Sequence, residues 1–157
     1  MENTIKKLKV SAIENGTVLD HIPANKLFEV IDILNLAKCQ NQVTFGTNLD
    51  SKLIGKKAII KVSDRYFADD EINKIALVAP LAKINIIKNF EVVEKRVISV
   101  PDEIIGIAKC SNPKCITNHQ PVDTKFKTVT ENGHLKLHCH FCEKMTDSNN
   151  LIILSKK

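Results

Sequence analysis

Short runs of alternating or β-branched apolar residues dominate the N-terminal part of the chain. Residues 7–13 begin with an alternating pattern, and residues 17–22, 42–47 and 57–62 combine apolar with β-branched side chains. Residues 83–98 are rich in Ile and Val and hold either one long strand or two short ones. The pattern therefore predicts a sheet of several short strands.

Two helices are expected between these strands. Pro23 opens the first helix, which ends near Ala37. Its apolar stripe consists of Leu27, Val30, Ile31 and Leu34, spaced at i, i+3, i+4 and i+7. Asp69 and Asp70 supply N-cap chemistry for a second helix through Leu77. The inner face of the second helix consists of Ile72, Ile75 and Ala76.

The expected order of elements is strand, helix, strand, strand, helix, strand. This is the split βαβ pattern of a ferredoxin-like sandwich, an α+β fold with an antiparallel sheet and two helices on one face. Pro101 interrupts the pattern, and we place a domain boundary there. The two expected domains are residues 1–100 and residues 101–157.

The second segment predicts a small all-β domain. Residues 126–130 and 135–138 flank the pair Asn132-Gly133, which is a strong signal for a hairpin turn. Residues 151–154 form the expected final strand. Because fewer than about 60 residues rarely bury enough apolar surface to fold unaided, we expect a metal ion to hold this domain together.

Cysteines in the second segment fall in two closely spaced pairs. The pairs read C-x4-C and C-x2-C, and they consist of Cys110, Cys115, Cys139 and Cys142. This spacing is typical of a tetrahedral thiolate zinc site that leaves no position for water, so we expect one structural zinc ion per chain. The alternatives are that His138 or His140 replaces a cysteine, or that the four cysteines are unrelated or disulfide-bonded.

Composition excludes several classes of protein. Apolar residues make up 43% of the chain, which supports a globular fold, but aromatic residues only 4%. No stretch approaches the roughly 20 uninterrupted apolar residues of a membrane span, and the N-terminus lacks the apolar core of a secretory signal. Cysteines grouped for metal binding suit a reducing compartment. We therefore expect a soluble cytoplasmic protein with no membrane partner.

Candidate chemistry in the first segment rests on lysines. The chain contains no Gly-rich phosphate loop and no nucleophile motif, and Asp20-His21 is an acid–imidazole pair without an evident partner. Lys57 and Lys61 differ by an even number, so in a regular strand they share a face, and Lys95 could lie on an adjacent strand. Converging lysines would make a phosphate-binding patch. The alternative is solvated lysines on an exposed face.

Three stretches together resemble a known family. They are G-T-V-L-D-H-I-P-A at residues 16–24, N-F-E-V-V-E-K at residues 89–95, and the cysteine pattern continued by Glu143 and Lys144. In this order they resemble the regulatory chain of aspartate carbamoyltransferase, and the resemblance covers nearly the whole chain.

The resemblance implies a non-catalytic subunit that acts in the allosteric control of pyrimidine biosynthesis. In the family, the N-terminal domain binds the effectors CTP, ATP and UTP, and the zinc domain contacts the catalytic chain. Regulatory chains pair into dimers through their N-terminal domains, and the dimers bridge catalytic trimers into a dodecamer. CTP inhibits, ATP activates, and UTP reinforces CTP.

The resemblance also implies a nucleotide site. The matching positions are Val10, Ser11, Ala12, Ile13, Val18, Asp20, His21, Lys57, Lys61, Asn85, Ile87, Phe90, Val92 and Lys95. Ser11 stands where many members have Glu, and Phe90 stands where many have Tyr. Both departures bear on which effector binds and how strongly, since Phe90 keeps the aromatic ring but loses the hydroxyl.

A zinc-ribbon nucleic-acid-binding protein is the competing hypothesis. The hairpin of the second segment carries basic and aromatic residues, namely Lys125, Phe126, Lys127 and Lys136. A net charge of only +5 and 18 acidic residues argue against it, as does the absence of aromatic stacking platforms in the first segment. We therefore expect no nucleic-acid partner.

Overall fold

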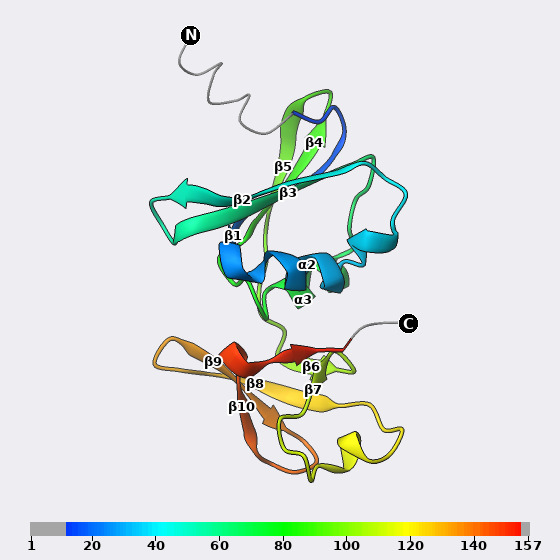
Figure 1. Cartoon of the computed structure of the whole chain (residues 1–157), viewed down its shortest axis with the longest axis vertical. Helices are drawn as coiled ribbons and strands as arrows, with labels where there is room; N and C mark the ends of the chain where they lie inside the picture. The colour runs from blue at the N-terminus through cyan, green and yellow to red at the C-terminus, as the bar shows by residue number, and fades with distance from the viewer. Residues whose placement is uncertain (1–11, 155–157) are drawn as a thin grey trace. The chain divides into compact units, whose positions relative to one another are not determined.

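The structure is a computed structural model that describes residues 12–154 (Figure 1). The described residues fall into two compact units, which divide between Ile98 and Ser99. Each unit builds its own sheet, so each is described by itself. Neither helix in the described part of the chain has the length and hydrophobicity needed to cross a membrane.

A five-stranded antiparallel sheet forms the first unit. Its strands are β1 (Gly16–Pro23), β2 (Val43–Ser51), β3 (Gly55–Ser63), β4 (Lys83–Lys88) and β5 (Glu91–Val97). They lie in the order β2-β3-β1-β4-β5, and both α2 (Leu27–Ile33) and α3 (Asp69–Ile75) cover one face (Figure 1). This confirms the predicted α+β class, with β5 added at the edge because residues 83–98 form a hairpin of two strands.

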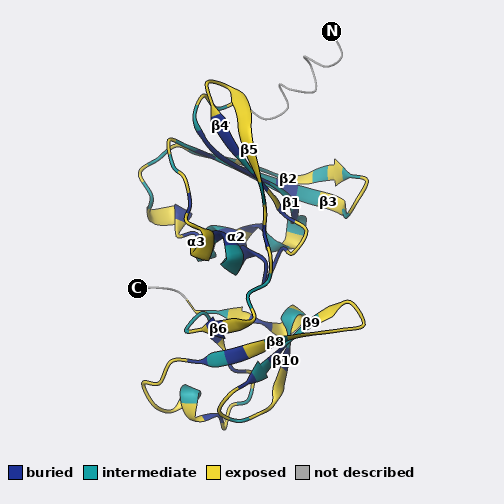
Figure 2. Ribbon diagram, turned by 180° about the vertical axis from the view of Figure 1, so that it is seen from behind, coloured by how far each residue is buried: buried dark blue, intermediate teal, exposed yellow. Residues whose placement is uncertain are grey.

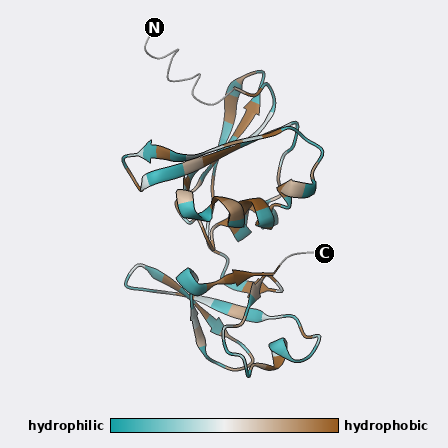
Figure 3. Cartoon of the chain, in the orientation of Figure 1, coloured by the Kyte–Doolittle hydropathy of each residue, from teal (hydrophilic) through white to brown (hydrophobic). Residues whose placement is uncertain are grey.

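Alternation along the strands decides which residues form the core of the first unit. Leu19 on β1 is paired with Ile60 on β3 and with Ile84 on β4, and all three side chains are fully buried. They belong to the face covered by the helices, which contribute Leu27, Val30, Ile72 and Ile75 to the core. Burial falls away toward the edge strand β5, which is mostly exposed (Figure 2). Most residues of α2 are apolar, whereas most of α3 is hydrophilic and contributes only Ile72 and Ile75 to the core (Figure 3).

The first helix is shorter than the sequence predicts. Instead of one helix from Pro23 to about Ala37, the seven-residue α2 lies between two 3-10 turns, η1 (Ala24–Lys26) and η2 (Leu36–Lys38). Asn35 adopts a left-handed conformation with φ of 55°, which ends the α-helical hydrogen-bonding pattern. Three of the four residues of the predicted apolar stripe, Leu27, Val30 and Leu34, are buried, whereas Ile31 is only partly buried.

The start of the second helix differs from the prediction by one residue. Ala68, with extended backbone angles, occupies the N-cap position, and Asp69 and Asp70 lie in the first turn. The carboxylate of Glu71 accepts a hydrogen bond from the backbone N–H of Ala68 at 3.2 Å. Acidic residues in the first turn still stabilise the helix through its dipole. The sequence therefore predicted the start of the helix correctly to within one residue, although the N-cap is Ala68.

The predicted strand at residues 7–13 lies largely outside the described residues. Residues 12 and 13 are described and have no strand geometry.

The second unit is all-β, as predicted. Its main sheet runs β10-β9-β8-β6, and β11 pairs with β7. The bounds are β6 (Glu103–Ile105), β7 (Ala108–Lys109), β8 (Lys125–Glu131), β9 (His134–Cys139), β10 (Met145–Asp147) and β11 (Ile152–Ile153), with short 3-10 turns η3 (Ile116–Asn118) and η4 (Ser148–Asn150). Asn132 and Gly133, at φ of 52° and 76°, make the two-residue hairpin turn that their sequence predicts. Ile104, Phe126 and Leu137 form the core.

Candidate functional site

The four predicted cysteines come together at one end of the second unit. Cys110 follows β7, Cys115 precedes η3, Cys139 ends β9, and Cys142 lies in the turn before β10. The Sγ atoms of Cys110 and Cys142 are 3.6 Å apart, and those of Cys115 and Cys139 are 3.8 Å apart. All four sulfur atoms lie within 4.8 Å of one another.

These sulfur separations fit a tetrahedral metal site. A metal–sulfur bond of about 2.3 Å gives a tetrahedron whose edges are about 3.8 Å long, close to the two shorter separations. A disulfide would need about 2.05 Å between sulfur atoms, and all four cysteines are free thiols. Among the described residues the cluster consists of these four cysteines, so neither His138 nor His140 belongs to it.

Side-chain hydrogen bonds fix the loop that holds the first cysteine pair. The amide of Asn118 donates to the carbonyl oxygens of Cys110 at 3.1 Å and Asn112 at 2.8 Å. The hydroxyl of Thr117 lies 3.1 Å from the sulfur of Cys115. Asn118 was not among the residues predicted for the site, although Asn is a residue type whose side chain commonly forms hydrogen bonds with nearby backbone groups.

Burial and hydrogen bonding give the thiols different acidities. Burial raises the pKa of the Cys110 thiol to about 12, and burial also raises the pKa of the Cys139 thiol. Burial acts in the same direction on Cys142, but hydrogen bonds from the Lys144 backbone, the Asn112 side chain and neighbouring thiols outweigh it and lower its pKa to about 7. A bound metal must therefore displace protons from Cys110 and Cys139, so metal affinity falls as pH falls.

A row of predicted nucleotide-site residues crosses the first sheet. Val18 on β1 is paired with Lys61 on β3 and with Asn85 on β4, and Asn85 is paired with Lys95 on β5. Alternation places this row on the face of the sheet opposite α2 and α3. We call this face, with Val18, Asp20, Lys57, Lys61, Asn85 and Lys95, the lysine face. Spacing predicted that Lys57 and Lys61 share a face. The expectation that Lys95 lies on an adjacent strand was wrong, because β1 and β4 separate β3 from β5, but the register places Lys95 on the same face.

Asp20 links two lysines of the lysine face. Its Oδ1 accepts a hydrogen bond from Lys57 Nζ at 2.9 Å and another from the backbone N–H of His21 at 2.6 Å. Burial lowers the pKa of Lys61, and the Asp20 carboxylate opposes that shift. An anion that binds beside this ammonium would favour its charged form.

His21 occupies an irregular position next to Asp20. The pairing of β1 with β3 shifts register between Leu19 and Ile22, and His21 has φ of 62° there. Its Nδ1 is buried, lies 3.5 Å from Asp20 Oδ1, and has no hydrogen-bond partner among the described residues. The ring nitrogen therefore lies beside the Asp20–Lys57 pair but forms no hydrogen bond with it.

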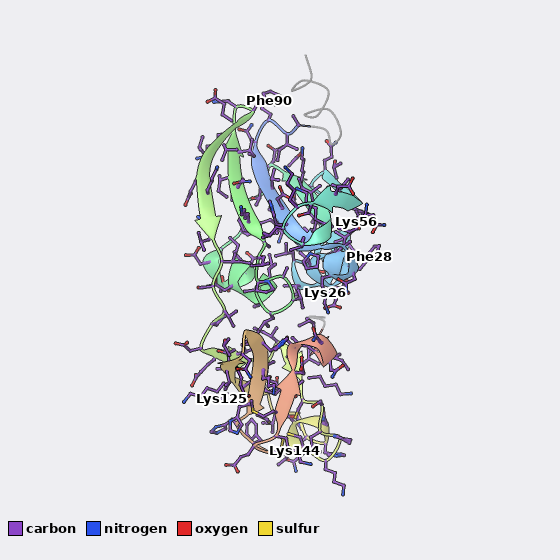
Figure 4. The ribbon with its side chains drawn as sticks, turned by 90° about the vertical axis from the view of Figure 1, so that its left-hand side faces the viewer. Lys26, Phe28, Lys56, Phe90, Lys125 and Lys144 are labelled. Atoms are coloured by element: carbon purple, nitrogen blue, oxygen red, sulfur yellow. The ribbon has the colours of Figure 1, made fainter. Side chains whose placement is uncertain are left out.

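The remaining predicted positions lie toward the β4–β5 hairpin. Ile87 is paired with both Gly16 and Val92, and Phe90 sits in the hairpin turn with φ of 65° and a 65% exposed side chain (Figure 4). The Phe90 backbone N–H donates to the Glu14 carbonyl at 2.9 Å, which ties this turn to the segment that contains Ala12 and Ile13. Val10 and Ser11 lie outside the described residues.

Lys83 also belongs to the lysine face, although it was not among the predicted site residues. It is paired with Asp20 and lies two positions before Asn85 on the same strand. Because Lys83 and Asn85 are two residues apart, strand alternation alone would have predicted that they share a face.

Known protein families match the sequence of each unit. A family model described as the aspartate carbamoyltransferase regulatory chain, allosteric domain, matches residues 8–99. The model described as the aspartate carbamoyltransferase regulatory chain, metal binding domain, matches residues 102–152. The chain belongs to the family of aspartate carbamoyltransferase regulatory chains. The metal binding match contains all four cysteines, and the allosteric match contains the whole lysine face.

Relatives from distant organisms support this membership over almost the full length. An aspartate carbamoyltransferase regulatory chain of Bacteroides thetaiotaomicron is 47% identical over 154 residues, which are 98% of this chain and 100% of the relative. One from Thermococcus sibiricus is 51% identical over 148 residues, covering 94% of this chain and 97% of the relative. One from Pyrococcus horikoshii is 49% identical over 148 residues, covering 93% and 97%. Family membership favours a regulatory chain over the zinc-ribbon nucleic-acid alternative.

Proposed function

We propose that this chain is the non-catalytic regulatory subunit of an aspartate carbamoyltransferase and that it binds nucleotide effectors on the lysine face. The observation that carries the proposal is the row in which Lys61 and Lys95 flank Val18 and Asn85. Neighbouring strands are about 4.8 Å apart, so three spacings separate the two lysine backbones by roughly 14 Å. The two long side chains could therefore both reach phosphates that lie between them.

Each part of the lysine face suits a different part of a nucleoside triphosphate. The ammonium groups of Lys61 and Lys95 supply charge-assisted hydrogen bonds to the phosphates. The Asp20 carboxylate, held by Lys57, accepts hydrogen bonds of the kind that ribose hydroxyls donate. Asn85 offers an amide donor and acceptor to a base, while Ile87, Val92 and Phe90 provide apolar contact. His21, Ala12 and Ile13, together with Val10 and Ser11, complete the site we propose.

We further propose that the effectors are CTP, ATP and UTP, since family membership supports control of pyrimidine synthesis. The chain has no catalytic role of its own in this scheme. A nucleotide can shift the activity of the assembly only through its difference in affinity between two states of that assembly. A coupling of about 1 kcal/mol per site is enough to change activity severalfold when several sites act together.

The metal we assign to the cysteine cluster is a structural Zn²⁺. Four thiolates are a ligand set that zinc favours, and sulfur separations of 3.6 and 3.8 Å support its tetrahedral geometry. The zinc ion would hold the loops around Cys110, Cys115, Cys139 and Cys142 in one arrangement. We propose that this domain, residues 101–157, contacts the catalytic chain, while residues 1–100 bind the effectors and pair regulatory chains into dimers. Free thiols that serve as ligands suit the cytoplasm, where we place the complex.

Calorimetry of the zinc-loaded chain with CTP, ATP and UTP at fixed salt tests the nucleotide site. Charge-assisted hydrogen bonds contribute about 1.5–3 kcal/mol, so Lys61→Ala and Lys95→Ala are each expected to weaken binding by tenfold or more. Lys56→Ala is the matched control. Lys56 lies on the same strand, β3, but forms an ion pair with Asp50 and lies well away from the Phe90 hairpin (Figure 4).

Two results would contradict the site. One is the absence of saturable binding for all three nucleotides. The other is an equal loss of affinity in the Lys56→Ala control, which would show that net charge, and not the lysine face, governs binding.

A further inference from the structure

Two Asn-Gly pairs occur in this chain, Asn15-Gly16 and Asn132-Gly133. An Asn followed by Gly is prone to deamidation because no side chain shields the following backbone nitrogen. In that reaction the Gly nitrogen attacks the Asn Cγ, and a new N–Cγ bond forms as the bond from Cγ to Nδ2 breaks. The Gly amide proton leaves with Nδ2 as ammonia. Water then opens the resulting succinimide to isoaspartate or aspartate. The two pairs lie in opposite structural environments.

Asn132-Gly133 forms the tip of the β8–β9 hairpin. Both residues are exposed, and a Cβ placed on Gly133 would meet no heavy atom within 4 Å. Ring closure requires the Asn backbone to rotate out of its turn conformation, so the tip must open. Only the terminal pair between Glu131 and His134 has to separate for this. Openings at a hairpin end are among the least costly local motions of a protein.

Asn15-Gly16 begins the central strand of the first sheet. Gly16 is buried and is paired with Ser63 on β3 and Ile87 on β4. The Asn15 side-chain oxygen accepts a hydrogen bond from the backbone N–H of Asn89 at 3.2 Å, and its carbonyl accepts one from Asp64 at 2.9 Å. Rotation at Asn15 therefore breaks contacts to the ends of both neighbouring strands, β3 and β4, at once, and water has no free approach to the buried Gly16.

We propose that Asn132 is a site of spontaneous deamidation in the folded protein and that Asn15 is protected. The modification places a new carboxylate next to Glu131, whose own carboxylate lies 3.5 Å from Lys136 Nζ. The isoaspartate product also adds a methylene carbon to the backbone of a two-residue turn. The hairpin tip thus changes charge and geometry with time, while Cys139 at the other end of β9 keeps its place in the cysteine cluster.

Incubation of the full zinc-loaded chain in ¹⁸O-water at mildly alkaline pH, followed by peptide mapping by mass spectrometry, tests the proposal. Deamidation incorporates one oxygen atom from water, so each modified peptide carries an isotope label. In the folded protein Asn132 is expected to convert at least about tenfold faster than Asn15, because the hairpin end opens far more readily than the sheet centre. In denaturant both pairs are expected to react at similar rates.

The two peptides come from one digest, so conversion during digestion affects both alike. Asn132→Gln keeps an amide at the tip but is expected to lose the rapid conversion, because its longer side chain closes the ring slowly. Zinc content is expected to stay constant while Asn132 converts. Equal rates at Asn15 and Asn132 in the folded chain would overturn the proposal. Conversion of Asn132 only after denaturation would overturn it too.

Discussion

Lys57 and Asp20 form a hydrogen bond between β3 and β1, with 2.9 Å between Nζ and Oδ1. The side chains are only 20% and 21% exposed, so water screens the attraction between their charges less than in a fully exposed salt bridge. The same carboxylate opposes the fall in the pKa of Lys61 that burial causes. One carboxylate therefore influences both lysines that β3 contributes to the lysine face, Lys57 and Lys61.

Replacing Lys61 by Met is expected to change how stability depends on pH. In the folded chain the pKa of Lys61 lies below its ordinary value of 10.5. Between the two values the unfolded state binds more protons than the folded state, so this residue makes the folded state more stable as pH rises through that interval. Lys61→Met removes this rise.

Urea unfolding followed by circular dichroism across alkaline pH measures the effect, with Lys56→Met as the control. The slope is expected to flatten in Lys61→Met alone. An unchanged slope would show that Lys61 titrates normally in the folded chain.

Triphosphate binding is expected to reverse the pKa shift of Lys61. The phosphate charges favour the ammonium form, so binding in alkaline buffer takes up protons. Calorimetry in buffers with different ionisation enthalpies gives the number of protons taken up for each nucleotide bound. Lys61→Met is expected to reduce this uptake, whereas Lys56→Met leaves it as it is. Binding with no proton uptake at any alkaline pH would place the phosphates away from Lys61.

Removal of the metal is expected to unfold the second unit and spare the first. Structural zinc contributes on the order of 10 kcal/mol to small domains, and the second unit has a core of few large side chains. The chain has no Trp and one Tyr, Tyr66, which lies in the first unit. Tyrosine fluorescence therefore reports on the first sheet alone, while circular dichroism reports on both units.

After chelation, circular dichroism is expected to change while Tyr66 emission stays native. The assembly with catalytic trimers is expected to dissociate in light scattering. An intact assembly after complete chelation would contradict the proposed role of residues 101–157. Loss of native Tyr66 emission would show that the first unit depends on the metal as well.

Residue spacing predicted which side chains come together better than it predicted the bounds of the helices and strands. The cysteine pattern was sufficient for the metal cluster, because two closely spaced pairs on turns leave few other arrangements. The even spacing of Lys57 and Lys61 predicted a shared face, because strands have a period of two. The sequence could not show the register shift at His21, since no Gly or Pro marks it. It also gave no sign that Asn35 would end the first helix, because Asn is tolerated within helices as well as after them.

Gly16→Ala is expected to destabilise the first unit by about 3 kcal/mol, through backbone strain and a steric clash. Gly16 has φ of 139°, and an added Cβ would lie 2.0 Å from the carbonyl oxygen of Val62. Gly55→Ala is the matched control, because Gly55 has φ of 82° but open space around its Cβ position. At Gly55 the loss of stability comes only from backbone strain and is expected to be about 1 kcal/mol.

Urea unfolding monitored by Tyr66 fluorescence compares the two variants on the same unit. The larger fall in transition midpoint is expected for Gly16→Ala, with zinc content equal in both proteins. A shift no larger than that of Gly55→Ala would mean that β1 can move away from β3 at little cost. In that case the pairing of Gly16 with Ser63 would not be what holds the row of Val18, Lys61 and Asn85 in register.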